Sequence, residues 1–149
     1  MRCNKDRQRR QGVTMVEGAI VLGVLFMLVL GMLDLGIMIF RQHVLSVATR
    51  HASRNASLHG SKAVVPWGPA TVGPVAASNT GQIPTAVRPQ LYGMKPSEVT
   101  VTVEWPDGIN EPGAKVRVTL SSPYQPIIAS LFGTASRQLT VTSIVPIIH

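Results

Sequence analysis

Cysteine is nearly absent from this chain, because Cys3 is the only one among 149 residues. A single thiol cannot form a disulfide within one chain, and no cysteine or histidine spacing typical of zinc binding is present. We therefore expect no disulfide framework, no structural metal and no cofactor, and we interpret Cys3 as an incidental thiol.

Aromatic residues are also scarce, at 5% of the sequence, and 7 acidic residues face 14 Lys and Arg residues. A net charge of +7 is typical of nucleic-acid binding, but so few aromatic side chains leave no platform on which bases stack. The charge is uneven, because residues 1–12 carry +4 and the other 137 residues carry +3. A basic cluster before an apolar run orients a membrane helix with its N-terminus in the cytoplasm. The charge therefore indicates a membrane partner and not nucleic acid.

Catalytic patterns are missing too, since no Ser–His–Asp set, Cys–His pair or carboxylate pair stands out. His43, His51 and His59 are spaced by eight residues. On a helix this spacing rotates each histidine by about 80° from the last, whereas zinc on a helix is bound by His at i and i+4. We expect solvated histidines and a protein that is not an enzyme.

A long apolar run, Gly18–Phe40, contains 23 residues with Asp34 as its only charge. A bilayer core is crossed by roughly 20 apolar residues, so this run is long enough to span it. A cleaved secretory signal has a shorter apolar core of about 7–15 residues and ends at a small-residue site, which is missing here. The sequence predicts a retained single-pass anchor with the residues after Arg41 outside.

Two carboxylates, Glu17 and Asp34, lie near the ends of this run, roughly 25 Å apart along a helix. A carboxylate at membrane depth is costly unless it reaches headgroups or a partner. For Asp34 the options are snorkelling and an approach to Arg41, two turns away. Glu17 has no cation at i+3 or i+4, so either its partner comes from elsewhere or headgroups solvate it. Ala19 and Gly23 form a small-xxx-small spacing that lets a second helix approach closely, and lipid-facing positions explain it equally well.

Helical patterning continues beyond the membrane run, and no proline interrupts residues 13–58, which predicts one helix of roughly 70 Å. An apolar stripe recurs at i+4 along its outer part. The stripe comprises Phe40, Val44, Ala48, Ala52 and Ala56, and the polar face includes Thr49 and Ser53. The Pro- and Gly-rich residues 59–97 predict a connection with little regular structure, pinned by the clusters Val64–Trp67 and Leu91–Tyr92.

Residues 98–149 alternate between apolar and polar residues in three places, which predicts three strands with one buried face. Their inward residues are Val99, Val101, Val103 and Trp105, then Val116, Val118 and Leu120, then Leu139, Val141 and Ser143. We interpret Asp107 and Glu111 as turn carboxylates and Ile127–Phe132 as a short helix. The predicted fold class is α+β: a long N-terminal transmembrane helix continues outside the membrane, with a small antiparallel sheet packed on its outer half.

The N-terminus carries a recognisable motif, in which Gly12 is followed by four residues, Glu17 and a long apolar helix. This resembles the processing site of type IV prepilins and pseudopilins. Further stretches resemble the TadE-like proteins of tight-adherence (Flp) pilus systems. These stretches are Gly12–Glu17, Leu33–Gly36 with Phe40 and Arg41, Ala48–Arg54 and the closing Leu139–Ser143.

The resemblance implies that a prepilin peptidase cuts between Gly12 and Val13 and removes the basic leader, residues 1–12. Glu17 then becomes the fifth residue and pairs with the α-amino group of Val13 on a neighbouring subunit. Gly18 after the glutamate departs from the family pattern, as does Gln11 before the glycine, so an uncleaved anchor stays open.

The predicted function is a non-enzymatic minor pilin or pseudopilin-like component of a tight-adherence pilus or secretion apparatus. The predicted location is the bacterial inner membrane, with other pilin subunits, the pilus assembly platform and the peptidase as partners. One alternative is a single-pass anchor that presents an adhesive or ligand-binding β domain. A membrane-tethered hydrolase is a third reading.

Overall fold

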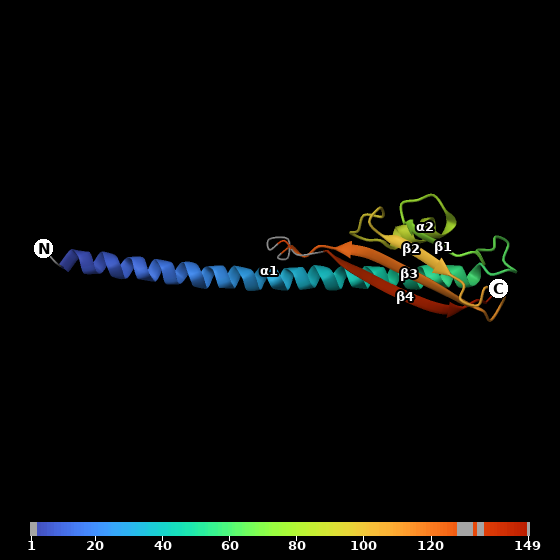
Figure 1. Cartoon of the computed structure of the whole chain (residues 1–149), viewed down its shortest axis with the longest axis horizontal. Helices are drawn as coiled ribbons and strands as arrows, with labels where there is room; N and C mark the ends of the chain where they lie inside the picture. Colours follow the sequence, from blue (N-terminus) through green and yellow to red (C-terminus); the bar gives the residue numbers. More distant parts are fainter. Residues whose placement is uncertain (1–2, 128–132, 134–135, 149) are drawn as a thin grey trace.

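One helix dominates the molecule. The computed structural model describes residues 3–127, 133 and 136–148, with side chains described from Met15 onward, so the predicted short helix Ile127–Phe132 lies outside the described residues except for Ile127. Helix α1 (Cys3–Leu58) is 56 residues long, and its first half projects alone from a small domain (Figure 1). The single long helix is confirmed, and it begins ten residues before the predicted start at residue 13. Its length is roughly 84 Å.

The domain contains a four-stranded antiparallel sheet in the order β1-β2-β3-β4. The strands are β1 (Val72–Ala76), β2 (Thr100–Glu104), β3 (Lys115–Tyr124) and β4 (Arg137–Pro146). Three of them follow the predicted alternation, and β3 and β4 pair along all ten residues. The predicted α+β class is confirmed, with one strand more than expected.

The extra strand arises in residues 59–97, where the prediction of little regular structure is wrong. This segment contains β1, helix α2 (Gln82–Val87) and a 3-10 turn, η1 (Arg88–Gln90). Proline is tolerated at the edge of a sheet, and β1 is an edge strand whose register shifts between Val72 and Val75. A Cβ at Gly73 would lie 2.5 Å from the carbonyl oxygen of Val101, so glycine is needed where β1 meets β2.

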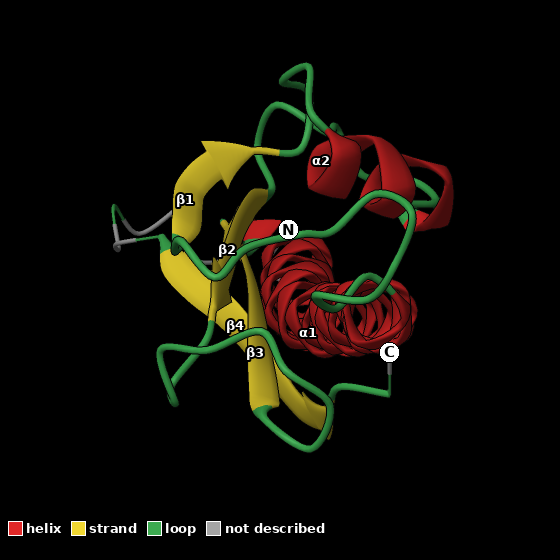
Figure 2. Cartoon of the chain, turned by 90° about the vertical axis from the view of Figure 1, so that its right-hand side faces the viewer, coloured by secondary structure: helices red, strands yellow, loops and turns green. Residues whose placement is uncertain are grey.

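The core lies between the sheet and the outer half of α1, which covers one face of the sheet (Figure 2). All the inward residues predicted for β2 and β3 and their flanks are buried, whereas Leu139 and Val141 of β4 are partly buried. They meet the predicted α1 stripe, of which Val44, Ala48, Ala52 and Ala56 are buried, together with Leu45. Among the described side chains, the domain packs on the outer half of α1, and every residue from Met15 to Val29 stays exposed.

Two details of the predicted helix faces are wrong. Thr49 and Ser53, assigned to the polar face, are buried against the sheet. Their hydroxyl groups are satisfied, because Thr49 Oγ1 donates to the carbonyl oxygen of Leu45 at 2.6 Å and Ser53 Oγ lies 3.1 Å from Ser143 Oγ. Conversely, Phe40 is 53% exposed although it belongs to the predicted stripe. Small hydroxyl side chains let the sheet approach α1 closely, which hydropathy patterning does not anticipate.

Candidate functional site

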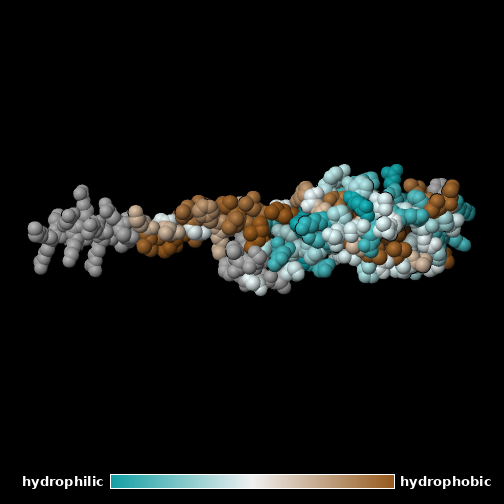
Figure 3. Space-filling model, turned by 90° about the horizontal axis from the view of Figure 1, so that it is seen from above, coloured by the Kyte–Doolittle hydropathy of each residue, from teal (hydrophilic) through white to brown (hydrophobic). Residues whose placement is uncertain are grey.

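The exposed apolar part of α1 is well defined. Every residue from Met15 to Val29 is exposed, and this projecting segment is apolar over most of its surface (Figure 3). Within the described residues, α1 is the one helix long and apolar enough to cross a membrane. The stretch Met15–Leu33 measures roughly 28 Å, close to the thickness of a bilayer core. These features support membrane anchoring through α1.

Of the four residues predicted for assembly and helix pairing, Glu17, Ala19 and Gly23 lie on this projecting segment, and the fourth is Asp34. The first three are exposed, and a Cβ built at Gly23 would meet no atom within 4 Å. From Met15 onward, no described side chain forms an ion pair with Glu17. Gly12 and Val13 lie within the helical backbone of α1. The roles of these residues in processing and assembly stay predictions, because a single chain brings no second helix to them.

Asp34 has partners within its own chain, at the end of β3 and on the connection that follows it. The Ile127 backbone N–H donates to Asp34 Oδ1 at 2.9 Å, and the Tyr124 hydroxyl donates to the Asp34 carbonyl oxygen at 2.9 Å. The Asp34 side chain is buried by these contacts. The membrane-proximal end of the sheet is therefore attached to α1 where the lipid-facing stretch ends.

Arg41 joins the same group through Tyr124. Its guanidinium carbon lies 5.5 Å from the centroid of the Tyr124 ring, within the range of a cation–π interaction. We call Asp34, Arg41, Tyr124 and Ile127 the Asp34 cluster. The sequence offered an approach of Asp34 to Arg41 as one of two options but did not reveal Tyr124, which lies 90 residues further along the chain from Asp34.

The Tyr124 hydroxyl has a perturbed pKa. Burial raises its pKa above the ordinary value of 10.0, the Asp34 carboxylate raises it further, and Arg41 lowers it. The folded protein therefore keeps the Tyr124 proton at a pH where the unfolded chain releases it. This contribution to stability is complete below pH 10.0 and is lost as the pH rises through the folded-state pKa.

We expect Tyr124→Phe to reduce the loss of stability in alkali. The wild-type free energy of unfolding should fall more steeply above pH 10.0 than that of the variant, which has no ionisable group at this position. Chemical unfolding in detergent at neutral and alkaline pH measures both slopes. Tyr92 is present in both proteins, so the difference reports Tyr124 alone. If the free energy of unfolding fell equally steeply with pH in the wild type and the variant, Tyr124 would have the same pKa in the folded and unfolded states.

The opposite end of the domain is organised by Asn110, which is buried. The Trp105 indole N–H donates to Asn110 Oδ1 at 3.2 Å, and Asn110 Nδ2 donates to the Trp67 carbonyl oxygen at 2.6 Å. The His59 ring stacks on Trp67 with centroids 4.3 Å apart, so the prediction of a solvated histidine is wrong for His59. An asparagine in a Pro- and Gly-rich turn looks like turn chemistry, so sequence reasoning missed this role.

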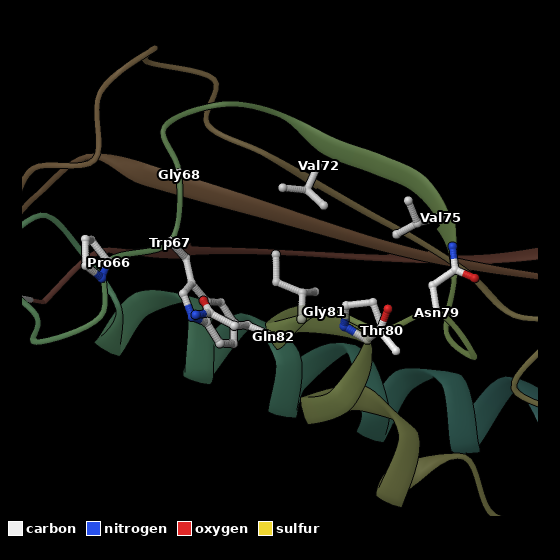
Figure 4. A pocket seen from close by; sticks show the side chains of 11 residues that line it. Pro66, Trp67, Gly68, Val72, Val75, Asn79, Thr80, Gly81 and Gln82 are labelled. Carbon is white, nitrogen blue, oxygen red and sulfur yellow. The ribbon is translucent and has the colours of Figure 1, made fainter.

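A mostly apolar cavity of about 340 Å³ lies beside Trp67 (Figure 4). It lies between β1 and the start of α2, and sequence reasoning missed it because β1 was not predicted. Its lining comprises Pro66, Trp67, Gly68, Val72, Val75 and Asn79–Pro84. Within the described residues, no three His, Cys, Asp or Glu side chains lie close enough to share a metal ion. The cavity thus offers hydrophobic contacts with a few polar side chains at its margin.

Comparison with known proteins identifies the N-terminal region. Residues 12–54 match a protein-family model described as TadE-like protein. A search of curated proteins gave no match, and a search of solved structures gave none either. The matched range begins at Gly12 and ends on the outer half of α1, so it includes Glu17, Asp34 and Arg41. This match confirms the resemblance seen in the sequence over these residues, and Leu139–Ser143 lie outside the matched range.

Proposed function

We propose that this TadE-like protein is a non-enzymatic minor pilin or pseudopilin-like component of a tight-adherence pilus or a related secretion apparatus. Its family associates the chain with the Tad pilus. The observation that carries the finer proposal is the projecting half of α1, whose apolar surface and Glu17 carboxylate are left uncovered by the chain's own domain. A bundle of such helices from neighbouring subunits supplies the missing contacts.

The proposed assembly begins in the bacterial inner membrane, with the basic leader in the cytoplasm. A prepilin peptidase cuts between Gly12 and Val13, which frees a positively charged α-amino group. Gly12 lies inside α1, so cutting requires the helix to open there, and glycine eases this because it is about 1 kcal/mol less favourable in a helix than alanine.

The new α-amino group of Val13 then pairs with Glu17 of a neighbouring subunit. A carboxylate in an apolar bundle is costly when it is unpaired, and pairing with a cation offsets that cost. Ala19 and Gly23 allow two helices to approach closely because their side chains are small or absent, and the space at Gly23 is open in the single chain. The mature subunit can then join the other pilins on the assembly platform.

We expect the mature chain to begin at Val13 and its assembly to depend on the Glu17 carboxylate. The intact mass of the protein extracted from membranes of a peptidase-positive host tests the first point. Glu17→Val should abolish incorporation into the pilus fraction, whereas Ile20→Val, at a neighbouring exposed position, should leave it unchanged. A chain that still begins at Met1 would refute cleavage, and normal assembly of Glu17→Val would refute the pairing.

A single-pass anchor that presents a ligand-binding domain is the second candidate, and the cavity beside Trp67 favours it. This function needs neither cleavage nor helix pairing. Gly12→Phe separates the two candidates, because the bulky side chain blocks cleavage after residue 12. A minor pilin loses assembly with this change, whereas a simple anchor stays monomeric in detergent and keeps its full function.

A further inference from the structure

An apolar collar surrounds α1 at the membrane-proximal end of the domain. Its side chains are all exposed, with Tyr92 the most exposed at 68%. The collar comprises Leu35, Ile39 and Phe40 of α1, Tyr92 from the segment after η1 and Ile127 from the segment after β3. Three segments far apart in the sequence thus present apolar surface at one level of the molecule.

Two contacts place Ile127 and Tyr92 at the same height along α1 as Leu35, Ile39 and Phe40. The backbone N–H of Ile127 bonds to Asp34, one residue before Leu35. Gly93, beside Tyr92, lies against Phe40, because a Cβ built on it would be 3.5 Å from Phe40 Cε1. The collar is therefore part of the folded domain, and it lies where α1 leaves that domain.

Three cations accompany the collar. Arg41 is one residue beyond Phe40, Lys95 is two residues beyond Gly93, and Arg137 pairs with Tyr124 in the sheet. Lys95 and Arg137 are exposed, and Lys95 lies 3.6 Å from Glu98 in a surface ion pair. Aromatic and apolar side chains mixed with Lys and Arg are typical of the membrane–water interface, where the ring or stem contacts lipid and the charge reaches water.

The position of the collar matches that interface. The stretch Met15–Leu33 accounts for roughly 28 Å of the bilayer core, and Asp34–Arg41 adds about 10 Å along α1. Headgroups extend the bilayer by several ångströms on each side of its core. Since the collar adjoins the lipid-spanning stretch, lipid is the partner that its exposed apolar side chains meet first.

We propose that the collar is a lipid-binding surface on which the domain rests against the outer leaflet of the membrane. Tyr92, Phe40 and Ile127 contact the interfacial region, and Arg41, Lys95 and Arg137 lie near the phosphates of anionic phospholipids. The proposal depends on membrane anchoring through α1 and not on the pilus assignment. It adds a second membrane contact, made by the folded domain, to the one made by the helix.

Tryptophan quenching by brominated lipids tests the proposal. The full chain is reconstituted at one copy per nanodisc in a mixture of phosphatidylcholine and phosphatidylglycerol with brominated acyl chains. Trp67 and Trp105 lie at the far end of the domain, because Trp67 stacks on His59 and the two tryptophans share Asn110. His59 is roughly 28 Å beyond Phe40 along the α1 axis, so both should stay unquenched.

Tyr92→Trp should add emission that is lost in brominated lipid, because a tryptophan at the membrane–water interface lies close to the acyl chains. Val64→Trp, at an exposed position near the far end, is the matched control and should not be quenched. Phe26→Trp, in the middle of the lipid-facing stretch, should be quenched strongly. Unquenched Tyr92→Trp beside quenched Phe26→Trp would overturn the proposal, and unquenched Phe26→Trp would refute the membrane anchoring on which it depends.

Charge reversal tests the role of the cations. Lys95→Glu combined with Arg137→Glu should lower the quenching of Tyr92→Trp in phosphatidylglycerol mixtures to its value in pure phosphatidylcholine. Both positions are exposed, and an unchanged emission spectrum of Trp67 and Trp105 verifies that the domain is folded. Equal quenching before and after charge reversal would overturn the assignment of anionic lipid.

Discussion

Asp34→Ala should loosen the membrane-proximal end of the domain while leaving its core folded. The Ile127 N–H loses a charged acceptor at 2.9 Å, and a hydrogen bond to a charged group contributes about 2 kcal/mol. Amide exchange at Ile127 should become faster by roughly 30-fold, because 1.4 kcal/mol corresponds to a factor of ten. Hydrogen exchange followed by NMR in detergent micelles measures this rate, and amides of β2 should keep theirs.

Two further variants serve as controls for Asp34. Asp34→Asn keeps one side-chain oxygen as an acceptor and should show a smaller increase. Glu98→Ala removes an exposed carboxylate, whose surface ion pair with Lys95 contributes little, and should leave Ile127 unchanged. Identical exchange in the wild type and Asp34→Ala would show that the carboxylate does not hold the connection after β3.

Gly68→Ala should cause the largest loss of stability, about 3 kcal/mol or more. Gly68 has φ of +85°, which is unfavourable for alanine, and its new Cβ would lie 2.5 Å from two ring atoms of Trp105. Trp105 cannot yield easily, because it is buried and its indole N–H donates to Asn110. Chemical unfolding followed by tryptophan emission measures the change.

Gly108→Ala is the matched control for this effect. Gly108 also has a positive φ, +68°, but its Cβ would meet no atom within 4 Å. It therefore reports the backbone cost alone, about 1 kcal/mol. If the two variants lost equal stability, the contact between residue 68 and the Trp105 ring would not be the cause.

The parts of the fold that follow local periodicity were predictable. Residues of β2 and β3 alternate strictly, so the alternation alone assigns Val101 and Val118 to the core, where both are buried. β1 was hidden, because Gly73 and Pro74 break the alternation and the strand forms only by pairing with β2. Its pairing depends on a partner roughly 30 residues away, which no local pattern reports.

In the candidate site, too, the residues marked by a local pattern were predictable, and their partners from distant segments were not. Asp34 stood out because a carboxylate at membrane depth is costly, but its partners Tyr124 and Ile127 become neighbours only when β3 lies along α1. Asn110 was missed for the same reason, since its partners Trp67 and Trp105 belong to separate segments. Glu17 was found by its spacing from Gly12, and its proposed partner belongs to another chain, so one folded chain cannot supply it.

The unbroken course of α1 has a mechanical consequence. No proline interrupts the helix between Met15 and Leu58, and the sheet packs along its outer half (Figure 1). The membrane segment and the domain therefore move together as one rigid unit. The part of α1 from Asp34 to Leu58 is roughly 36 Å long, so tilting the membrane segment by about 10° would swing the far end of the domain by about 6 Å. Strands β3 and β4 run along this part of α1, and they are paired over ten residues. A force that pulls the two strands apart along their length would therefore act on all of their hydrogen bonds at once.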